Sequence, residues 1–319
     1  MADPQAHRRI SAEARDAGLG RAQSLTVLLK AAIDLRLDSL LPATSPGPVR
    51  LVEAMRYGLL SPAKRVRGVL TCLSTRQFGR DPASAETFAA AIEMVHAASL
   101  ILDDLPCMDD AAIRRGRPAC HKIYGEDTAT LAAVALMNHA FRCVAGDAAL
   151  PEALRVDLAL RLAVAIGPDG LTGGQEQDLR EAAEIQSVAD VEMMHARKTG
   201  VLFGLATAGG ARIASAGDET SFEMRAFGDK LGLAFQTYDD VLDAHSTIEV
   251  AGKDVGQDTS KVTVVTLLGV GRAKACADQH VDEALKHLNA AGGDIGPTLA
   301  FVHGMIDQLN ARAPRISGG

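Results

Sequence analysis

The sequence predicts an all-α protein, and three observations support this prediction. Near the start, apolar residues recur at every fourth position, which is the spacing of a single stripe along one face of a helix: Leu25, Leu29, Ile33, Leu37 and Leu41. The run over residues 84–102 is rich in alanine and apolar on several faces, as in a helix buried at the centre of a bundle. Strand-like alternation and Asn-Gly hairpin signals do not occur.

Proline and glycine divide the first part of the chain into helices. The first helix is expected to stop at Pro42, because residues 42–48 (PATSPGP) break any regular structure. A second helix is expected from Pro48, and its apolar residues are Leu51, Met55 and Leu59. A third is expected from Ser61 and Pro62, with serine as the N-cap and proline in the first helical position.

The rest of the chain also has helical periodicity. The expected segments are 127–146, 151–166, 176–184, 188–215, 219–246, 258–270 and 271–290, with glycine-rich joints at 167–174 and 252–256. No stretch rich in proline and serine separates two parts. We therefore expect one helical domain over residues 1–319, with about residues 1–20 as a mobile N-terminal segment.

Composition and charge exclude several classes of protein. With 47% hydrophobic and 23% charged residues, the chain is neither disordered nor of low complexity. Aromatic residues make up only 3%, with no tryptophan, so the core must be filled by Ala, Leu, Val and Ile. The net charge of −7, from 33 Lys and Arg against 40 Asp and Glu, argues against a nucleic-acid partner, as does the scarcity of aromatic platforms for bases.

Cysteine usage and hydropathy indicate a cytoplasmic protein. There are five cysteines without a Cys-x-x-Cys pair, most of them in apolar surroundings, which is typical of reduced, buried thiols: Cys72, Cys107, Cys120, Cys143 and Cys276. The N-terminus has no apolar segment of a secretory signal. The longest uncharged stretch, residues 128–141, is too short to span a bilayer, so no transmembrane segment is expected.

Two aspartate clusters are the strongest indication of chemistry. The first follows the long apolar run and has the sequence DDLPCMDD, with candidate metal ligands Asp103, Asp104 and Asp109. The second lies within another apolar segment and has the sequence DDVLD, with candidates Asp239, Asp240 and Asp243. On a helix, Asp239 and Asp243 share one face, where two like charges repel each other.

Cations would relieve this repulsion, and ligands that are all carboxylates favour a hard ion such as Mg²⁺ shared with phosphate oxygens. An EF-hand calcium loop fits poorly, because its glycine and terminal glutamate are missing. The alternative is that both clusters are solvated helix ends. Two clusters that each follow a long apolar run make that alternative the weaker one.

Basic and polar residues occur at matching helical spacings. Lys64 and Arg67 share a face, and His96 lies two turns before the first cluster on the same face. The other candidates flank the two clusters: Arg114, Arg115, Lys198, Thr199, Gln236, Lys253 and Lys261. Each alone is typical of a surface charge or a satisfied core group. Together they suggest two diphosphate sites, one bridged by metal and one bound by Lys, Arg and His.

These motifs, in this order, resemble those of the trans-isoprenyl diphosphate synthases. DDLPCMD resembles the first aspartate-rich motif in its bacterial form, and DDVLD resembles the second. PAKRVR, GGQEQD, RKTG and GKDVGQDTSK resemble four further segments of the family, so the likeness covers residues 25–290. The central block is most similar to bacterial geranylgeranyl diphosphate synthases of carotenoid pathways. The resemblance implies an orthogonal helical bundle of the isoprenoid synthase type around a central apolar tunnel, and typically a homodimer.

The resemblance also implies a reaction and its residues. Three Mg²⁺ ions, bound by the two aspartate clusters, would hold an allylic diphosphate with help from Arg114, Lys198, Lys253 and Lys261. Thr199 and Gln236 would face the allylic cation that forms when diphosphate leaves. Isopentenyl diphosphate would bind Lys64, Arg67, His96 and Arg115, and add to that cation in a head-to-tail, trans condensation.

Small residues before the first cluster predict the product length. In the family, an aromatic residue about five positions before the first aspartate stops growth at fifteen carbons. This chain has Ala98 and Ser99 there, with Val95 one turn deeper. The expected product is therefore the C20 compound, geranylgeranyl diphosphate.

Three alternatives differ in product or in activity. A farnesyl or longer-chain synthase would use the same chemistry. A class I terpene cyclase also uses aspartate clusters, but it needs aromatic walls and lacks the isopentenyl site that Lys64, Arg67 and Arg115 suggest. A non-catalytic subunit of a heteromeric synthase tends to lose an aspartate motif, and both are intact here.

Overall fold

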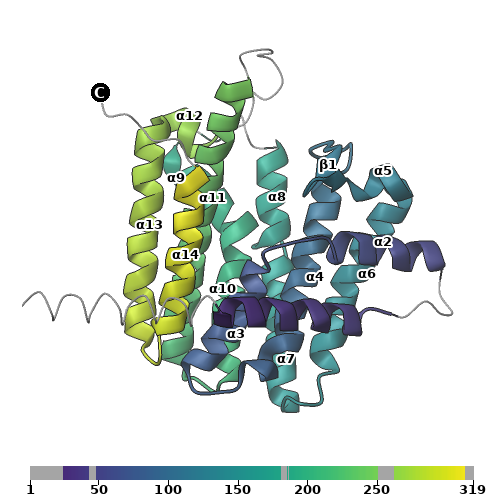
Figure 1. The fold of residues 1–319 in the computed structure, drawn as a ribbon, viewed down its shortest axis with the longest axis vertical. Helices are drawn as coiled ribbons and strands as arrows, with labels where there is room; N and C mark the ends of the chain where they lie inside the picture. Colours follow the sequence, from purple (N-terminus) through teal and green to yellow (C-terminus); the bar gives the residue numbers. More distant parts are fainter. Residues whose placement is uncertain (1–23, 43–47, 181–184, 186, 251–261, 313–319) are drawn as a thin grey trace, which may run out of the picture.

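The protein is a bundle of helices in the computed structural model (Figure 1), which describes residues 24–42, 48–180, 185, 187–250 and 262–312. The first helix is described over residues 24–40. The next elements are α2 (Val49–Leu59), α3 (Val66–Gln77), η1 (Pro82–Ala85), α4 (Glu86–Asp103), β1 (Ile113–Arg114), β2 (Arg117–Pro118), α5 (Cys120–Tyr124), α6 (Glu126–Ala145) and α7 (Glu152–Ile166). The remaining elements are α8 (Leu171–Arg180), α9 (Val188–His195), η2 (Ala196–Gly200), α10 (Val201–Ile213), α11 (Asp218–Val250), α12 (Val264–Leu268), α13 (Val270–Ala291) and α14 (Gly296–Arg312).

Helix α4 lies in the middle of the bundle, as its apolar sequence predicts. It packs against α3 and α6, and its fully buried residues include Phe88, Ile92 and Met94. Alanines fill much of the rest and let neighbouring helices approach closely. Asp81 caps the preceding turn η1, because its side chain accepts a hydrogen bond from the amide of Ala83.

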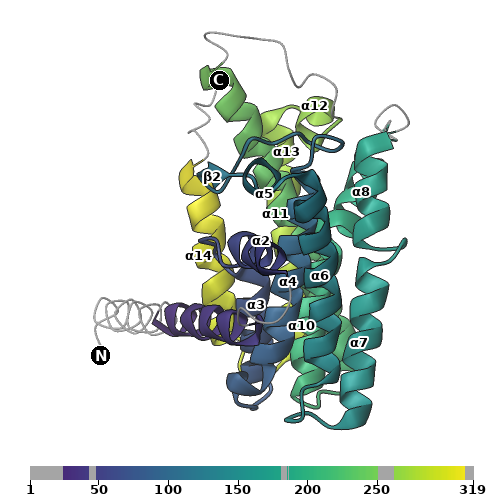
Figure 2. The same ribbon diagram turned by 90° about the vertical axis from the view of Figure 1, so that its right-hand side faces the viewer.

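The long helix α11 forms the second axis of the bundle. It packs against α10 and α13, and α13 and α14 cover one side of it (Figure 1). Helices α6, α7 and α8 lie along another side of the molecule (Figure 2). One continuous apolar core includes residues from Leu29 to Leu309, and a smaller cluster of α9, α11, α12 and α13 lies around Val191 and Val264.

Hydropathy and burial agree on the role of α4. One helix of the described chain, Pro82–Asp103, is long and apolar enough to cross a membrane. Because 78% of its most apolar window is buried inside the protein, it has the environment of a core helix.

Three local predictions were wrong. Helix α3 begins at Val66, not at Ser61, because Arg65 adopts a left-handed conformation with φ of 52° that ends any earlier helical path. The expected joint at 167–174 is already helical from Leu171. The expected helix 188–215 is divided by η2, a π-turn that separates α9 from α10.

Candidate active site

The first aspartate cluster lies where α4 ends. Asp103 is the last residue of the helix, and its carbonyl accepts a hydrogen bond from the amide of Asp109 at 2.9 Å, which folds the cluster back into a tight turn. Asp104 is buried and bonded to Arg114, whose Nε donates to Oδ1 at 2.8 Å. Asp104 therefore fixes Arg114, whereas Asp103 is half-buried and Asp109 is exposed at the rim of the site.

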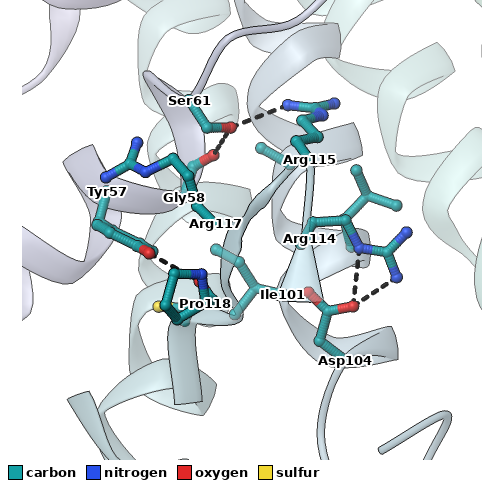
Figure 3. Close-up of a pocket in the computed structure, with 12 residues that line it drawn as sticks. Tyr57, Gly58, Ser61, Ile101, Asp104, Arg114, Arg115, Arg117 and Pro118 are labelled. Carbon is teal, nitrogen blue, oxygen red and sulfur yellow. Dashed lines mark hydrogen bonds and ion pairs between the residues drawn. The ribbon is translucent and has the colours of Figure 1, made fainter. Parts of the chain in front are cut away.

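A two-residue hairpin, which the sequence did not predict, carries the arginines that follow this cluster. Strands β1 and β2 pair Arg114 with Arg117, and the turn between them places Arg115 and Gly116 at positive φ values of 54° and 74°. Arg115 Nη1 donates to Ser61 Oγ at 3.0 Å, which ties the turn to the end of α2 (Figure 3). A non-glycine residue in this conformation costs about 1–3 kcal/mol and is typical of functional sites. The strained turn aims Arg114 and Arg115 to different partners.

The second aspartate cluster is linked to η2 through one glutamine. Gln236 accepts a hydrogen bond from Thr199 Oγ1 at 2.9 Å and donates to Asp240 Oδ1 at 3.3 Å. This contact needs a close approach of α11 to η2, since a Cβ on Gly232 would lie only 2.6 Å from the Cα of Gly200. Asp239 and Asp240 are half-buried, and Asp243, one turn further, is exposed.

Burial raises the pKa of one carboxyl in each cluster. The pKa of Asp103 rises to about 6, because burial and the neighbouring Asp109 outweigh the charge of Lys198. The pKa of Asp240 rises to about 7, because burial and the like charges of Asp239 and Asp243 outweigh the hydrogen bond from Gln236. Both clusters thus bring together carboxylates whose like charges repel one another.

These carboxylates fit Mg²⁺. Asp240 Oδ2 is buried without a hydrogen-bond partner among the described residues, and the nearest basic group is His195 Nε2 at 3.8 Å. Burial lowers the pKa of His195 to about 4, so this histidine is neutral near pH 7 and does not compensate the carboxylate. An oxygen-only donor set with excess negative charge is the kind that hard divalent cations occupy.

A separate group of cations surrounds His96. The pKa of this imidazole lies well below its usual value, because it is buried and because Arg67 and Arg115 lie nearby, followed by Arg65 and Arg114. Arg67 is buried against the ring of Phe203, with its guanidinium carbon 4.7 Å from the ring centroid. Its Nε has no hydrogen-bond partner among the described residues. A neutral imidazole and a buried guanidinium with an unpaired Nε are the donors that an anionic ligand would need.

Sequence reasoning missed three residues that support the predicted ones. Asp178 on α8 accepts a hydrogen bond from Lys198 Nζ at 2.7 Å and so positions that lysine. Buried Glu93 accepts from the amide of Gly68 at 2.9 Å and lies 3.8 Å from Arg65, which makes it the counter-charge of the arginine group. The third is His195, beside Asp240. Of these three residues, only Asp178 could have been found from the sequence, because it ends the GGQEQD segment.

The remaining predicted residues lie on α4, in the loop before α3, or outside the described part of the chain. Lys64 lies exposed in the loop before Arg65. Val95 and Ala98 are buried in α4, and the half-buried Ser99 donates a hydrogen bond from Oγ to the His96 carbonyl at 2.9 Å. Lys253 and Lys261 lie outside the described residues, so their roles stay predictions.

Comparison with known proteins identifies the family. A family model described as polyprenyl synthetase matches residues 48–298. The chain belongs to the polyprenyl synthetase family. Among its relatives, the geranylgeranyl diphosphate synthase of Pantoea ananas is 40% identical over 88% of this chain and 92% of that protein. The farnesyl diphosphate synthase of Geobacillus stearothermophilus is 39% identical over 80% of this chain and 87% of that protein.

Solved structures agree with this assignment. A geranyltransferase from Legionella pneumophila superposes with a TM-score of 0.81 at 27% identity, covering 92% of this chain and 99% of that one. A synthase from Zymomonas mobilis, described as an FPP/GFPP synthase, has a TM-score of 0.78 at 32% identity. The match covers 89% of this chain and 99% of that one. The predicted all-α fold and the resemblance to trans-isoprenyl diphosphate synthases are confirmed. Membership of the polyprenyl synthetase family supports trans-prenyl transfer as the reaction.

The raised pKa of Asp240 gives a prediction for the metal-free protein. A folded-state pKa above the usual 3.8 means that native Asp240 keeps a proton that the unfolded chain has already lost, so its contribution to stability falls as pH rises from about 4 to about 7. Asp240→Asn should therefore gain stability over the wild type progressively across this range, measured by urea unfolding in chelator. The comparison between the two proteins is needed because His96 and His195, with lowered pKa values, change stability in the opposite direction.

The matched control is Asp110→Asn, which alters an exposed carboxylate that lies 3.5 Å from Lys122. It should follow the wild-type pH profile. A constant difference between Asp240→Asn and the wild type across the range would contradict the prediction.

Proposed function

We propose that the protein is a Mg²⁺-dependent prenyltransferase that condenses isopentenyl diphosphate with an allylic diphosphate to give geranylgeranyl diphosphate. The observation that carries the proposal is the pairing of two aspartate clusters with a separate group of buried and half-buried arginines around His96. One part of this region attracts metal ions and the other attracts anions directly. Two diphosphate substrates, of which one binds through metal, require this division.

The metal-binding residues of the proposal are Asp103 and Asp109 on one side and Asp239 on the other, with Asp104, Asp240 and Asp243 as further ligands or supports. When bound, Mg²⁺ would stabilise the negative charge of the departing diphosphate. Lys198, held by Asp178, and Arg114, held by Asp104, would contact the same diphosphate. Both cations are fixed before substrate binds, so little reorganisation is needed when charge develops on the leaving group.

The residues around η2 would stabilise the allylic cation. Thr199 directs its hydroxyl hydrogen to Gln236, which leaves the hydroxyl oxygen to face positive charge. Such fixed dipoles favour a developing cation without becoming bonded to it. Lys253 and Lys261 are proposed as additional contacts to diphosphate.

Isopentenyl diphosphate would bind Arg67, His96 and Arg115, with Lys64 reaching in from its exposed loop. Arg67 is buried and His96 is half-buried, so an anion here would lose water but gain charge-assisted hydrogen bonds. The double bond would then attack the allylic cation, and the proton lost afterwards would pass to the released diphosphate. No protein base is required in this scheme.

The test is product analysis with the purified chain, Mg²⁺, isopentenyl diphosphate and each allylic primer in turn. The expected main product is geranylgeranyl diphosphate, with no turnover after chelation. A C15 product would support the alternative of a farnesyl synthase, which relatives of that kind also favour. Absence of turnover with every primer would exclude a synthase that acts alone, and a cyclic hydrocarbon product would indicate a terpene cyclase.

The C20 product length follows from the small residues of α4. The proposal places Ala98, Ser99 and Val95 in the wall of an apolar tunnel, so Ala98→Phe should shorten the main product to C15. Ser99→Phe, one turn from Asp103, tests the same wall if the fully buried Ala98 site cannot hold the ring. Ala98→Ser is the control and should keep the wild-type product. Chromatography of the dephosphorylated products gives the lengths, and an unchanged length in both Phe variants would refute the tunnel argument.

We also propose a homodimer formed through α6 and α7. On α7 the apolar side chains of Val156, Leu160 and Val164 repeat at every fourth position and are about 60% exposed: 63%, 62% and 60%. Leu131 and Val134 are also exposed, at 59% and 55%, on α6, which packs beside α7 (Figure 2). Exposed apolar patches of this kind are typical of subunit interfaces.

Leu160→Asp should convert the dimer to a monomer, because two-fold symmetry would bring the new carboxylate into an apolar interface in both subunits. Sedimentation velocity gives the mass. Phe222→Asp is the control, because Phe222 is equally exposed, at 67%, but lies on α11. A dimer that survives Leu160→Asp would place the interface elsewhere.

We further propose that residues 1–319 form one domain and that the protein acts in the cytoplasm. The first proposal is supported by the single core that contains both Leu29 and Leu309. The second is supported by the five cysteines, which are all free, and of which Cys72, Cys120 and Cys143 are buried like small apolar residues. The predicted mobile segment at about residues 1–20 lies outside the described residues.

A further inference from the structure

A further group of side chains that could hold a metal ion contains none of the clustered aspartates. It consists of Glu192 on α9 and of Cys276 and His280 on α13. Cys276 and His280 are four residues apart, so one turn of helix places both on the same face. Neither aspartate cluster uses these residues, and no diphosphate-binding role was assigned to them.

The three ligand atoms form a triangle of the size that a tetrahedral zinc ion requires. Cys276 Sγ lies 3.6 Å from His280 Nε2 and 3.3 Å from Glu192 Oε1, and Nε2 lies 3.1 Å from that oxygen. Zinc bonds of about 2.3 Å to sulfur and about 2.0 Å to nitrogen and oxygen, at tetrahedral angles, give separations of about 3.6, 3.5 and 3.3 Å. The three observed separations lie within about 0.2 Å of these values.

The surroundings of His280 also match a metal ligand. The imidazole is 95% buried, and its Nδ1 has no hydrogen-bond partner among the described residues. The carboxylate of Glu283 lies 4.0 Å from Nδ1 and is itself held by Lys230 Nζ at 2.6 Å. At 4.0 Å this carboxylate does not accept a hydrogen bond from Nδ1, but it lies on the side of the ring where a ligating histidine usually has an acidic or carbonyl partner. The side chain of Glu192 is 30% exposed, which leaves a path for an ion to enter.

We propose that Glu192, Cys276 and His280 bind Zn²⁺, with water as the fourth ligand. Thiolate and imidazole favour this ion over Mg²⁺, which prefers oxygen ligands. The ion would join α9 to α13. Because α9 continues into η2, it would also restrain the segment that carries Lys198 and Thr199. None of the three ligands is a residue of the proposed prenyl-transfer site, so either proposal can fail while the other stands.

Cobalt substitution tests the thiolate ligand directly. The full-length, reduced protein is stripped of metal, given excess Mg²⁺ to occupy the oxygen sites, and titrated with Co²⁺. A charge-transfer absorption from thiolate to cobalt in the near ultraviolet is expected in the wild type and should be lost in Cys276→Ser. Cys107→Ser is the matched control, because Cys107 is exposed beside the first aspartate cluster and is the other thiol that a metal could reach there. This variant should keep the band.

Zinc-dependent stability gives a second measurement. Zn²⁺ should raise the midpoint of thermal unfolding of the wild type and of Cys107→Ser, but not that of Cys276→Ser or His280→Gln. Circular dichroism verifies that each variant is folded. An absent cobalt band in the wild type, a band that persists in Cys276→Ser, or a band lost only in Cys107→Ser would overturn the proposal and leave a plain hydrogen-bonded triad.

Discussion

Asp103→Asn is expected to lower kcat by about 10³-fold while leaving the KM for isopentenyl diphosphate nearly unchanged. A metal ion at a departing diphosphate supplies several kcal/mol of transition-state stabilisation, and each 1.4 kcal/mol corresponds to a tenfold rate change. Asparagine keeps the volume of the side chain but removes the charge that binds the ion. The proposed isopentenyl site uses Arg67, His96 and Arg115, none of which this change touches, so its affinity should survive.

The measurement is steady-state kinetics over a range of Mg²⁺ concentrations, in parallel with Asp239→Asn. Both variants should need more Mg²⁺ for half-maximal rate. Asp110→Asn is the control, because this residue belongs to the same sequence run but lies exposed at a φ of 45°, which asparagine accepts easily. A loss in Asp110→Asn as large as that in Asp103→Asn would mean that the whole turn matters and not the metal ligand.

Gly174→Ala is expected to reduce both stability and activity through the backbone of η2. A Cβ at Gly174 would lie 2.4 Å from the amide nitrogen of Lys198 and 2.8 Å from the carbonyl carbon of Arg197. Because these are backbone atoms, α8 and η2 must move apart, and the bond from Lys198 to Asp178 bridges the same two elements. Overpacking of this kind costs about 1–3 kcal/mol, and a displacement of about 1 Å costs about 10²-fold in rate.

Urea unfolding and kinetics would measure the two effects. Gly304→Ala is the control: this glycine lies inside α14, and a Cβ there would contact nothing within 4 Å. It should gain about 0.5–1 kcal/mol in stability, since alanine is the better helix former, and keep wild-type activity. If Gly174→Ala kept full activity despite lower stability, the position of Lys198 would not depend on this contact.

Much of the fold could be predicted because helical periodicity depends on local sequence. The core helix α4 and the long helix α11 both follow from apolar patterns. The hairpin at Arg114–Arg117 could not be predicted, because two-residue strands have no periodicity. The start of α3 was wrong for a related reason: Arg65, in its left-handed conformation, bonds Asp34, which lies 31 residues earlier in the chain, as well as the nearby carbonyl of Leu59.

In the site, too, local patterns could be predicted and contacts between separated segments could not. Paired aspartates on a helix can be recognised from their spacing, as Asp239 and Asp243 were. The contacts of Lys198 with Asp178 and of Thr199 with Gln236 join elements about 20 and 37 residues apart, and no local rule connects them. The family resemblance provided the positions of Lys198 and Thr199, but their partners became visible only in the packed structure.

The π-turn η2 makes the residue count between α9 and α10 critical. A π-turn holds one residue more than the α-helical path over the same rise. Deleting a single residue from Ala196–Gly200 would therefore restore an unbroken α-helix and leave α9 and α10 in place. The turn itself would change, and with it the directions in which Lys198 meets Asp178 and Thr199 meets Gln236. In this segment a one-residue deletion that improves local helix geometry is therefore more damaging than most substitutions.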